Sequence, residues 1–470
     1  MHILSRLNSE EKRYWLLFAV AAISFLPAIG FYYVGEEAIF PIVSQEMWER
    51  GVWLKQYLYG SDLRHNPLFN WLIIPFSILA GWEHVLPVTR TLTVSATLAT
   101  ALTLWWMTRR LFGDRTFAVF AAVGYLTMAD LLLYHGWLSY VDPIYATFIF
   151  AAIATLWIGV RERCISLVAL SGLLLTCAFL AKALTAYIFY GGALFVLLFA
   201  KEQRAFLLNW RTLAVLALTF SGPLIWYASI PDGIAQGWRM YGELTDKFEH
   251  PGISAYATRL VSFPAEILFW LGPLTLLALY FRLRGRYRPE PSTNDRLLFF
   301  SAMAMILVNF LPYWISPRGG MRYLIPLYPL VALVATRIVW QSGEAARLLT
   351  GKWIVGALAL KFAVVLAIFP YYQSQYRGQN YDETAADIFV LTQGQPLYSA
   401  NSSAAGLSVT AYLNKRRLPA PALQFPPTNW QSGFVVTLTA DERQGKVFRK
   451  YRLGRDDLYL LCRGQACNTP

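Results

Sequence analysis

The chain has 470 residues, of which 56% are hydrophobic, 16% are aromatic and only 15% are charged. Because a soluble domain carries about a quarter charged residues, this composition excludes disordered, collagen-like and disulfide-scaffold proteins and predicts a chain embedded largely in a bilayer. The net charge of +13 arises from 41 Lys and Arg against 28 Asp and Glu. In a membrane protein such an excess marks the loops that hold the orientation, so we expect membrane lipids and no nucleic acid as partners.

The first apolar stretch covers residues 14–33 and follows Arg6, Lys12 and Arg13. A positive flank before the first span predicts an N-terminus on the inside of the membrane. No Ala-x-Ala cleavage pattern follows, so we expect a retained anchor rather than a removed signal peptide.

A second apolar stretch, residues 67–81, is shorter than the roughly 20 residues that a spanning helix needs. If it crossed the membrane, the cluster of Arg109, Arg110 and Arg115 after the next span would lie outside, against the positive-inside rule. We therefore expect a re-entrant or interfacial helix within one long external loop, residues 35–87.

Later apolar stretches alternate consistently with this orientation and place the C-terminus outside. Together with the first stretch they predict a polytopic α-helical membrane protein with about 11 spans and at most about 13. The later spans are expected near residues 88–108, 117–137, 141–160, 164–182, 184–200, 212–230, 262–281, 297–316, 322–340 and 353–371.

Beyond the last span the hydropathy falls to that of a soluble domain. Residues 382–393 have helical spacing, while residues 433–438 and 457–461 have the pattern of short strands. We therefore expect a transmembrane domain over residues 1–372 and a small external α/β domain over residues 373–470.

Two cysteines, Cys462 and Cys467, stand five residues apart near the C-terminus. They are able to form a disulfide if this end faces an oxidising compartment. The spacing suits many backbone conformations, so unpaired thiols stay open as the alternative.

The first span ends in Gly35, Glu36 and Glu37 rather than in an aromatic residue or a cation. One interpretation is an N-cap and first-turn pair for a helix over residues 38–49, whose dipole favours anions at that end. The other is a catalytic carboxylate at the membrane boundary. Adjacent residues on a helix point about 100° apart, so we expect one of the two to face a shared cavity.

Asp142 stands at an equivalent depth, directly before Pro143 at the outer start of a predicted span. Asp followed by Pro at the first helical position commonly caps a helix, which is the simpler interpretation. Because Asp142 shares the outer face with Glu36 and Glu37, it is also a candidate catalytic residue.

Several cations on the outer face run against the positive-inside trend and are candidate phosphate ligands. The forked arginine guanidinium suits phosphate oxygens, whereas a lysine at a span end also snorkels to the surface. The candidates for binding a donor phosphate or lipid are Arg64, His65, Lys182, Arg318, Arg322 and Tyr323.

Acids and cations on one outer face indicate chemistry on a lipid phosphate at the membrane surface. The sequence has neither a Walker A loop nor a Gly-x-Gly-x-x-Gly run after a strand, so an activated lipid would supply the energy of any synthesis. The His-Glu-x-x-His spacing of a metal site is absent as well. We expect no obligatory cofactor or metal and leave a divalent cation open.

Six short runs stand in a fixed order between about residues 10 and 340. They are Gly35-Glu36-Glu37-Ala38, Ser44-Gln45-Glu46-Met47, Arg64-His65-Asn66-Pro67-Leu68-Phe69-Asn70-Trp71, Leu111-Phe112-Gly113, Val141-Asp142-Pro143 and Arg322-Tyr323-Leu324-Ile325-Pro326-Leu327-Tyr328-Pro329. This ordered set resembles the polyprenyl-phosphate-sugar-dependent glycosyltransferases of GT-C architecture, the relatives of protein O-mannosyltransferases and of the lipid A aminoarabinose transferase.

The resemblance implies that Glu36 occupies the position of the family's catalytic Asp, with one extra methylene, and that Asp142 matches its second external acid. The aminoarabinose transferases carry an Arg three residues after their Asp and a Lys before a Pro-Pro-Leu run. This chain has Ile39 and His65 at those places. The departure argues against their particular donor and acceptor, and it assigns the donor phosphate to the cations of the outer face.

The resemblance also implies a membrane glycosyltransferase that acts on a polyprenyl-phosphate sugar of the undecaprenyl type, with inversion and with Glu36 as the base. The acceptor is a hydroxyl or phosphate of a lipid, glycan or protein at the periplasmic face of a bacterial inner membrane. Two alternatives are a flippase or transporter of lipid-linked sugar, which would place charges near the midplane of repeat-related broken helices, and a lipid-linked glycan ligase.

Overall fold

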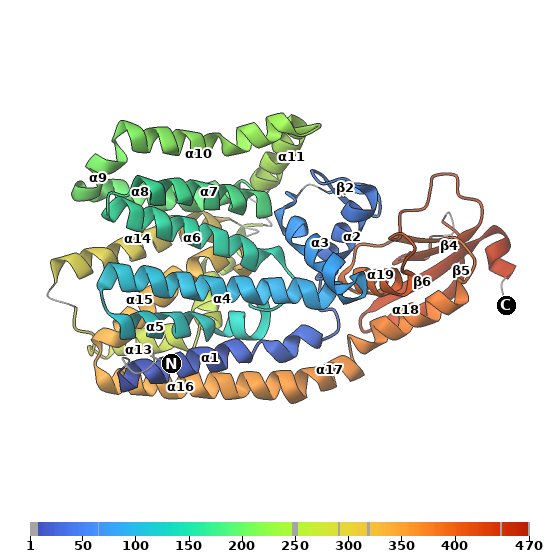
Figure 1. The fold of residues 1–470 in the computed structure, drawn as a ribbon. Coiled ribbons are helices and arrows are strands. Elements are labelled where there is room, and N and C mark those ends of the chain that lie inside the picture. Colours follow the sequence, from blue (N-terminus) through green and yellow to red (C-terminus); the bar gives the residue numbers. More distant parts are fainter. Residues whose placement is uncertain are drawn as a thin grey trace. The chain divides into compact units, whose positions relative to one another are not determined.

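Among the residues that the computed structural model describes, seven helices are long and apolar enough to cross a membrane, or eight if one bent helix pair counts as a single span. Four shorter apolar helices accompany them (Figure 1). The protein is therefore a polytopic helical membrane protein, as the composition predicts, while the exact number of spans stays a prediction. The structure describes residues 8–63, 65–246, 252–289, 292–316, 320–441 and 444–468.

The candidate spans fall where the hydropathy of the sequence places them. The seven long ones are Ser9–Gly30, Trp82–Phe112, Val141–Arg161, Trp210–Ser229, Thr293–Ile315, Met321–Gln341 and Glu344–Gln375.

The chain folds into two compact units that interleave along the sequence. We call the first the helical unit; it consists of Met1–Leu26, Val94–Trp137 and Val141–Phe362. The second, the mixed unit, consists of Pro27–Thr93, Leu138–Tyr140 and Ala363–Pro470. The long loop after the first span therefore packs with the C-terminal region in one unit. The predicted division after residue 372 stays a prediction.

The helical unit is built from helices that pack along their lengths. Helix α6 packs against α7, and α5 packs against both α1 and α15. Most residues of α6 are buried, so it is an interior helix of this unit. The bounds are α1 Ser9–Ile23, α4 Val85–Phe112 (which begins in the mixed unit), α5 Arg115–Leu126, α6 Val141–Arg161, α7 Ile165–Ala181, α8 Thr185–Phe199, α9 Lys201–Leu207, α10 Trp210–Ser229, α11 Gly233–Asp246, α12 Ile253–Trp270, α13 Leu274–Leu283, α14 Thr293–Ile315, η5 Met321–Leu327, α15 Tyr328–Gln341 and α16 Glu344–Ala363.

Two predicted spans are not continuous helices. The stretch 117–137 breaks after Leu126, and a separate π-helical turn covers Leu131–His135. The stretch 262–281 bends by 107° between α12 and α13. Pro273 stands at this bend and has no N–H to continue the helical ladder. In both places hydropathy marks an apolar stretch without revealing that the backbone turns inside it.

The mixed unit combines the loop after the first span with a small α/β region. The predicted interfacial helix is α3, whose 13 residues are about 20 Å long and too short to cross about 30 Å of hydrocarbon. The bounds are α2 Ile39–Arg50, β1 Gln56–Leu58, β2 Ser61–Leu63, α3 Leu68–Ala80, η3 Trp82–His84, η6 Val364–Ile368, α17 Phe369–Gln375, α18 Gln379–Leu391, β3 Leu397–Ala400, α19 Ala404–Arg417, β4 Gly433–Thr437, β5 Lys446–Leu453, β6 Asp456–Arg463 and η7 Gly464–Asn468.

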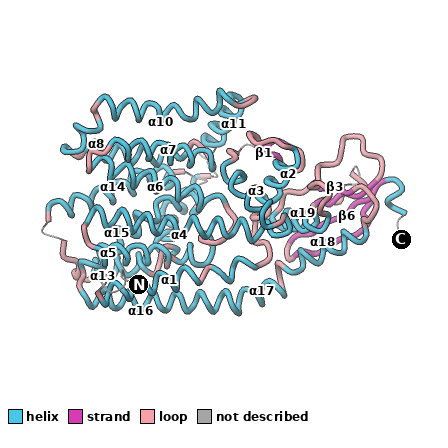
Figure 2. Tube along the Cα trace, viewed as in Figure 1, coloured by secondary structure: helices cyan, strands magenta, loops and turns pink. Residues whose placement is uncertain are grey.

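The C-terminal sheet, whose strands are magenta in Figure 2, has the strand order β3-β4-β6-β5. Strand β3 pairs parallel with β4, and the other two pairings are antiparallel. Helices α18 and α19 pack on each other and contact strands β5 and β4, respectively. The helix and the two strands that the sequence pattern predicts here are confirmed as α18, β4 and β6, with bounds shifted by a few residues.

One hydrophobic core joins the two parts of the mixed unit. Tyr33, Ala38 and Ile42 from the loop after the first span are buried in the same cluster as Ile388 and Phe434 from the C-terminal region. The apolar surface of the loop is therefore removed from water by the C-terminal region, and the two parts stabilise each other.

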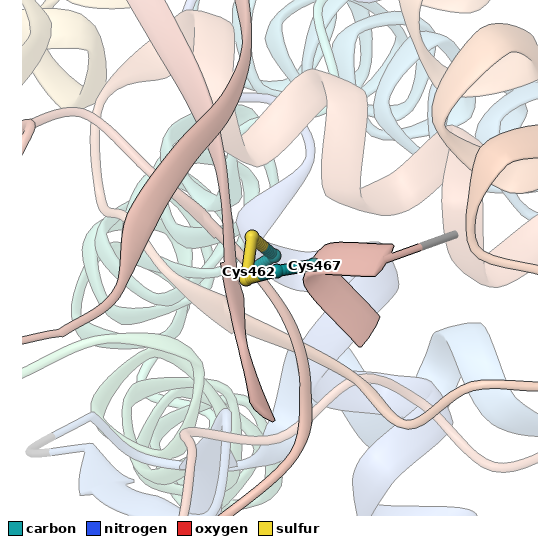
Figure 3. Close-up of a disulfide and its surroundings, with 2 residues drawn as sticks. All are labelled: Cys462 and Cys467. Atoms are coloured by element: carbon teal, nitrogen blue, oxygen red, sulfur yellow. A yellow bond between two sulfur atoms is a disulfide. The ribbon is translucent and has the colours of Figure 1, made fainter. Parts of the chain in front are cut away.

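The C-terminal end is closed by a disulfide between Cys462 and Cys467 (Figure 3). Cys462 lies on β6, and the 3₁₀ turn η7 brings Cys467 back beside it. The sequence left this pair open, and the structure forms the bridge.

Helix α2 presents a buried acid, Glu46, to the C-terminal region. Its carboxylate accepts hydrogen bonds from the backbone N–H of Gly60, at 3.0 Å, and from the Gln424 amide. The neighbouring charges are Arg50 and Glu49. Burial dominates and raises the pKa of Glu46 from its usual 4.5 to about 7.

The buried acid makes stability depend on pH. Because the pKa of Glu46 is higher in the folded protein than in the unfolded chain, folding binds a proton between these two values. We expect the free energy of unfolding to fall as the pH rises from 4.5 to about 7, by up to about 1.4 kcal/mol per unit, and then to level off.

Thermal unfolding of the detergent-solubilised protein at several pH values measures this effect, as the difference between the wild type and Glu46→Gln. Glu83→Gln, which changes an acid whose side chain is 52% exposed, is the control. A Glu46→Gln profile with the same slope as the wild type between these pH values would contradict the assignment.

Candidate functional site

The acidic pair lies on a turn that leads into α2. Gly35 has φ of 60°, a backbone conformation that favours glycine, and the N–H of Glu37 donates to the Val34 carbonyl at 3.4 Å. Helix α2 begins only at Ile39, with Ala38 as its N-cap and no side-chain hydrogen bond capping it. The capping interpretation of the two acids is therefore wrong.

Glu37 forms an ion pair with Arg90 in which neither side chain has any exposed surface. The carboxylate accepts from Arg90 Nε at 2.9 Å and from Arg90 Nη2 at 2.7 Å. It also accepts from the backbone N–H groups of Val34 and Ser139, both at 2.7 Å. These four hydrogen bonds to the carboxylate help to offset the free energy that it costs to remove the two charges from water.

Arg90 also holds the backbone that precedes the acidic turn. Its remaining donors satisfy carbonyls at the end of the first span, where a helix leaves carbonyls without partners. These carbonyls belong to Ala28 at 3.1 Å, Ile29 at 3.3 Å, Phe31 at 2.5 Å and Tyr32 at 2.8 Å.

The C-terminal region holds the same stretch from the other side. The amide of Gln373 accepts from Tyr32 N–H at 3.2 Å and donates to the Tyr32 carbonyl at 3.1 Å. The Tyr33 N–H donates to the Tyr412 hydroxyl at 3.2 Å. The backbone leading to the acids is thus fixed by side chains from α4, α17 and α19.

Glu36 is exposed, in contrast to its buried neighbour. Its backbone N–H donates to the Tyr140 hydroxyl at 3.2 Å. As expected for adjacent residues, the two carboxylates diverge, and only Glu36 is accessible to a substrate. Tyr140 precedes Asp142 by two residues in the sequence.

Asp142 and Lys182 form a second ion pair, within the helical unit. Asp142 lies in the first turn of α6, and its carboxylate accepts a hydrogen bond from Lys182 Nζ. This ammonium also lies 5.5 Å from the ring centroid of Tyr145 and 5.0 Å from that of Tyr323. The capping interpretation of Asp142 and the snorkelling interpretation of Lys182 are therefore replaced by a mutual contact.

Arg322 lies at the edge of this cluster. Its guanidinium is 5.3 Å from the Tyr323 ring centroid and donates to the Tyr323 hydroxyl at 3.4 Å. Both Arg322 and His135 are near enough to act electrostatically on Asp142. The structure thus brings together Asp142, Lys182, Arg322 and Tyr323 among the predicted site residues.

The structure does not test the remaining predicted phosphate ligands. His65 is exposed and belongs to the mixed unit, in the turn before α3. Arg64 and Arg318 lie outside the described residues.

Sequence reasoning overlooked a buried polar cluster around Asp130. Its carboxylate accepts from Nδ1 of His135 at 2.8 Å and from the Tyr328 hydroxyl at 2.7 Å. The exposed fractions are 4%, 7% and 1% for Asp130, His135 and Tyr328, so the cluster is interior.

A buried lysine, Lys361 of α16, was overlooked as well. Its ammonium donates to the Leu132 carbonyl in the π-helical turn and lies 5.3 Å from the ring centroids of both Phe25 and Trp137. These contacts tie the turn that carries His135 to two other segments of the helical unit.

One signal marks all of the overlooked ionisable residues. Arg90, Asp130, His135 and Lys361 lie inside stretches that were predicted as membrane spans. An ionisable side chain within a span is costly and therefore a candidate for a functional or organising role. Reading the span interiors with this rule would have found them.

In the part of the chain that the structure describes, no three His, Cys, Asp or Glu side chains are grouped closely enough to hold a metal ion.

The fold is similar to that of two solved structures of one protein, ArnT, and at this level of sequence identity the likeness concerns the fold alone. In particular, the chain is similar to ArnT from Cupriavidus metallidurans bound to undecaprenyl phosphate, with a TM-score of 0.70, 14% identity, and coverage of 97% of this chain and 98% of that one. The apo state of the same protein gives a TM-score of 0.65 and 16% identity over the same shares. An Archaeoglobus fulgidus oligosaccharyltransferase with Zn and sulfate gives 0.52 and 13% identity, over 90% of this chain and 67% of that one.

One curated relative matches by sequence. It is the undecaprenyl phosphate-alpha-4-amino-4-deoxy-L-arabinose arabinosyl transferase of Edwardsiella ictaluri (strain 93-146), 25% identical over 356 residues. The match covers 72% of this chain and 61% of that protein, less than two thirds of its length. No model of a protein family matches the chain.

The two acids of the turn are expected to respond differently to substitution. Glu37→Gln leaves the buried guanidinium of Arg90 without its counter-charge, which should lower the free energy of unfolding by about 3–5 kcal/mol. Glu36→Gln changes an exposed side chain and should shift it by less than about 0.5 kcal/mol.

Unfolding of the detergent-solubilised variants measures this difference. The double variant Glu37→Gln with Arg90→Met removes both charges and should recover part of the lost stability. Equal stability of Glu37→Gln and Glu36→Gln would contradict the organising role of the buried pair.

Proposed function

We propose that the protein is an integral membrane glycosyltransferase that moves a sugar from a polyprenyl phosphate of the undecaprenyl type to an acceptor hydroxyl or phosphate. The reaction takes place at the periplasmic face of a bacterial inner membrane, with the N-terminus in the cytoplasm. The acceptor is a lipid, a glycan or a protein. Two similarities support this: the fold matches ArnT bound to undecaprenyl phosphate, and the curated relative is named as an undecaprenyl-phosphate sugar transferase.

The observation that carries the proposal is the exposed carboxylate of Glu36 on a rigidly held turn. The buried pair of Glu37 and Arg90 fixes the backbone before Glu36 and the residue after it, so the turn that carries Glu36 is held in place. A base that is held in place before the substrate arrives needs little reorganisation during the reaction.

In the proposed reaction, the acceptor oxygen attacks the anomeric carbon while the bond from that carbon to the phosphate oxygen breaks. The carboxylate of Glu36 takes the proton from an acceptor hydroxyl, and the bonding electrons leave with the polyprenyl phosphate. Attack from the side opposite the leaving group inverts the anomeric centre. Glu37 does not touch substrate in this scheme and acts as a positioning residue.

The leaving phosphate gains negative charge, which fixed cations stabilise best in a site that excludes water. We assign this role to Lys182 and Arg322, with Tyr323 as a flanking donor. Asp142 holds the Lys182 ammonium in place, and the faces of Tyr145 and Tyr323 limit its movement. Asp142 is therefore a positioning residue for the cation.

The departures from the aminoarabinose transferases bear on the substrates. Ile39, a half-buried residue of α2, is apolar, and His65 stands where those enzymes carry a lysine, so the fixed cations of those enzymes are not present at these two places. A different donor sugar or acceptor is the expected consequence. No obligatory cofactor enters the scheme, and a divalent cation stays open because it would serve the same electrostatic role.

Glu36→Gln should abolish transfer. Loss of a general base typically slows the reaction by a factor of about 10² to 10⁴, while binding of the lipid donor should persist. The measurement is turnover of a purified preparation with radiolabelled polyprenyl-phosphate sugars, with thermal unfolding as the check on folding. Glu83→Gln is the matched acid-to-amide control, and near-normal turnover of Glu36→Gln would remove Glu36 from its role.

Lys182→Ala should lower kcat by a factor of about 10² to 10³ if the ammonium stabilises the leaving phosphate in the transition state. A rise in KM with kcat unchanged would instead indicate that Lys182 only binds the donor in its ground state. Asp142→Asn should also lower kcat, by a smaller factor, because the Lys182 ammonium remains but is held less firmly. Lys352→Ala, at an exposed lysine of α16, serves as the control.

The same labelled donors separate the alternative functions. A transferase moves the label from lipid to acceptor, a flippase or transporter leaves it on the lipid, and a lipid-linked glycan ligase accepts only a preassembled glycan. Retention of the label on the lipid with every acceptor class would overturn the proposal.

A further inference from the structure

A pocket of the helical unit, which we call the arginine pocket, lies between the α13–α14 loop and the end of α15. It encloses about 560 Å³ and is lined by Arg282, Arg296 and Arg337, with Asp295 as the acid among its lining residues. The N–H of Arg288 donates to the Gln341 carbonyl at 3.4 Å, which ties the loop to the end of α15. None of the residues proposed for sugar transfer lines this pocket.

The charge of the pocket is positive even after internal pairing. Asp295 accepts from Arg337 at 3.3 Å, and the Arg337 side chain is only 5% exposed. Its guanidinium lies over the rings of Phe112 and Phe117, at 4.6 and 4.9 Å from their centroids. Asp295 is thus engaged by a fixed arginine, and the pocket presents the cations of Arg282 and Arg296 at an exposed surface.

An apolar groove continues from this pocket. It encloses about 420 Å³ between α12, α13, α14 and α15, and it shares Arg282, Met303 and Ile338 with the arginine pocket. Its other lining residues are almost all apolar, including Leu327 and Val331. Helices α14 and α15 belong to candidate spans, so the groove lies among segments expected in the hydrocarbon of the bilayer.

We infer that this composite surface binds an anionic glycerophospholipid, with the headgroup phosphate on Arg282 and Arg296 and one acyl chain in the groove. Arginine guanidinium groups match phosphate oxygens in pairs of hydrogen bonds. A free anion would satisfy the pocket but leave the groove empty, whereas a phospholipid satisfies both. Charge complementarity and the continuity of groove and pocket therefore select this occupant.

The surface lies where such a lipid is expected to be found. The loop carries Arg282, Arg284, Arg286 and Arg288, which the positive-inside rule places in the cytoplasm. Anionic lipids of the cytoplasmic leaflet attract basic side chains near the membrane. The bound lipid would anchor the ends of α13, α14 and α15 at the cytoplasmic face of the membrane.

Lipid binding by the detergent-solubilised full chain tests the inference. Native mass spectrometry gives the dissociation constants of phosphatidylglycerol and phosphatidylcholine. We expect tighter binding of phosphatidylglycerol and a loss of about thirtyfold in Arg282→Ala with Arg296→Ala, because each basic side chain contributes a factor of about five near an anionic lipid. Arg284→Ala with Arg286→Ala, in the same loop but outside the pocket, is the matched control and should bind as the wild type does.

A second pair of variants tests the groove. Val331→Trp fills it and should weaken phosphatidylglycerol binding, whereas Leu283→Trp changes a side chain that is 77% exposed outside the groove and should not. Inorganic phosphate should not compete with the lipid at millimolar concentration. Thermal unfolding identifies any variant that fails to fold, and Arg282→Lys with Arg296→Lys then provides a charge-conserving replacement that should retain most of the binding.

Several results would overturn the inference. They are equal binding of the two phospholipids, unchanged phosphatidylglycerol binding in the double alanine variant, occupancy by undecaprenyl phosphate to the exclusion of phosphatidylglycerol, and a second copy of the chain covering the groove. All of these readouts are independent of sugar transfer, so failure here leaves the proposed function standing, and failure of the proposed function leaves this inference standing.

Discussion

The buried ion pair of Glu37 and Arg90 organises the part of the molecule that carries the candidate base. One carboxylate accepts four hydrogen bonds, and one guanidinium reaches four backbone carbonyls of the preceding segment. Such a pair is not by itself a large source of stability, because desolvation offsets much of the attraction. What the pair does provide is a set of hydrogen bonds that holds the backbone from Ala28 to Glu37 at several points.

This constraint gives the two adjacent carboxylates different surroundings. Glu37 forms the buried ion pair with Arg90 and is inaccessible, whereas Glu36 is exposed on the same turn. A parallel arrangement occurs in the helical unit, where Asp142 holds Lys182. In each unit a buried acid positions a neighbour, and the neighbour is the group that we propose to act on substrate. The arginine pocket repeats the pattern, with Asp295 engaged by Arg337 and other cations at the surface.

Local patterns predicted much of the fold, and their failures have a common cause. Hydropathy located the long helices, and period-two alternation located β4 and β6. The same hydropathy missed the break before Leu131 and the bend at Pro273, because a polar backbone turn inside a protein is satisfied by partners distant in sequence. Likewise, local sequence suggested helix capping as one role for Glu36 and Asp142. In the structure their contacts are with residues distant in the sequence, Tyr140 and Lys182.

The sequence by itself determined the membrane embedding, the order of the helices, the acidic turn and the candidate chemistry, since these follow from composition and short motifs. Only the tertiary structure decided which acid of the turn is buried. Its partner Arg90 stands 53 residues later in the chain, and the donor Ser139 stands 102 residues later. Periodicity reports which face of an element is apolar, but it carries no information about which distant charge meets that face.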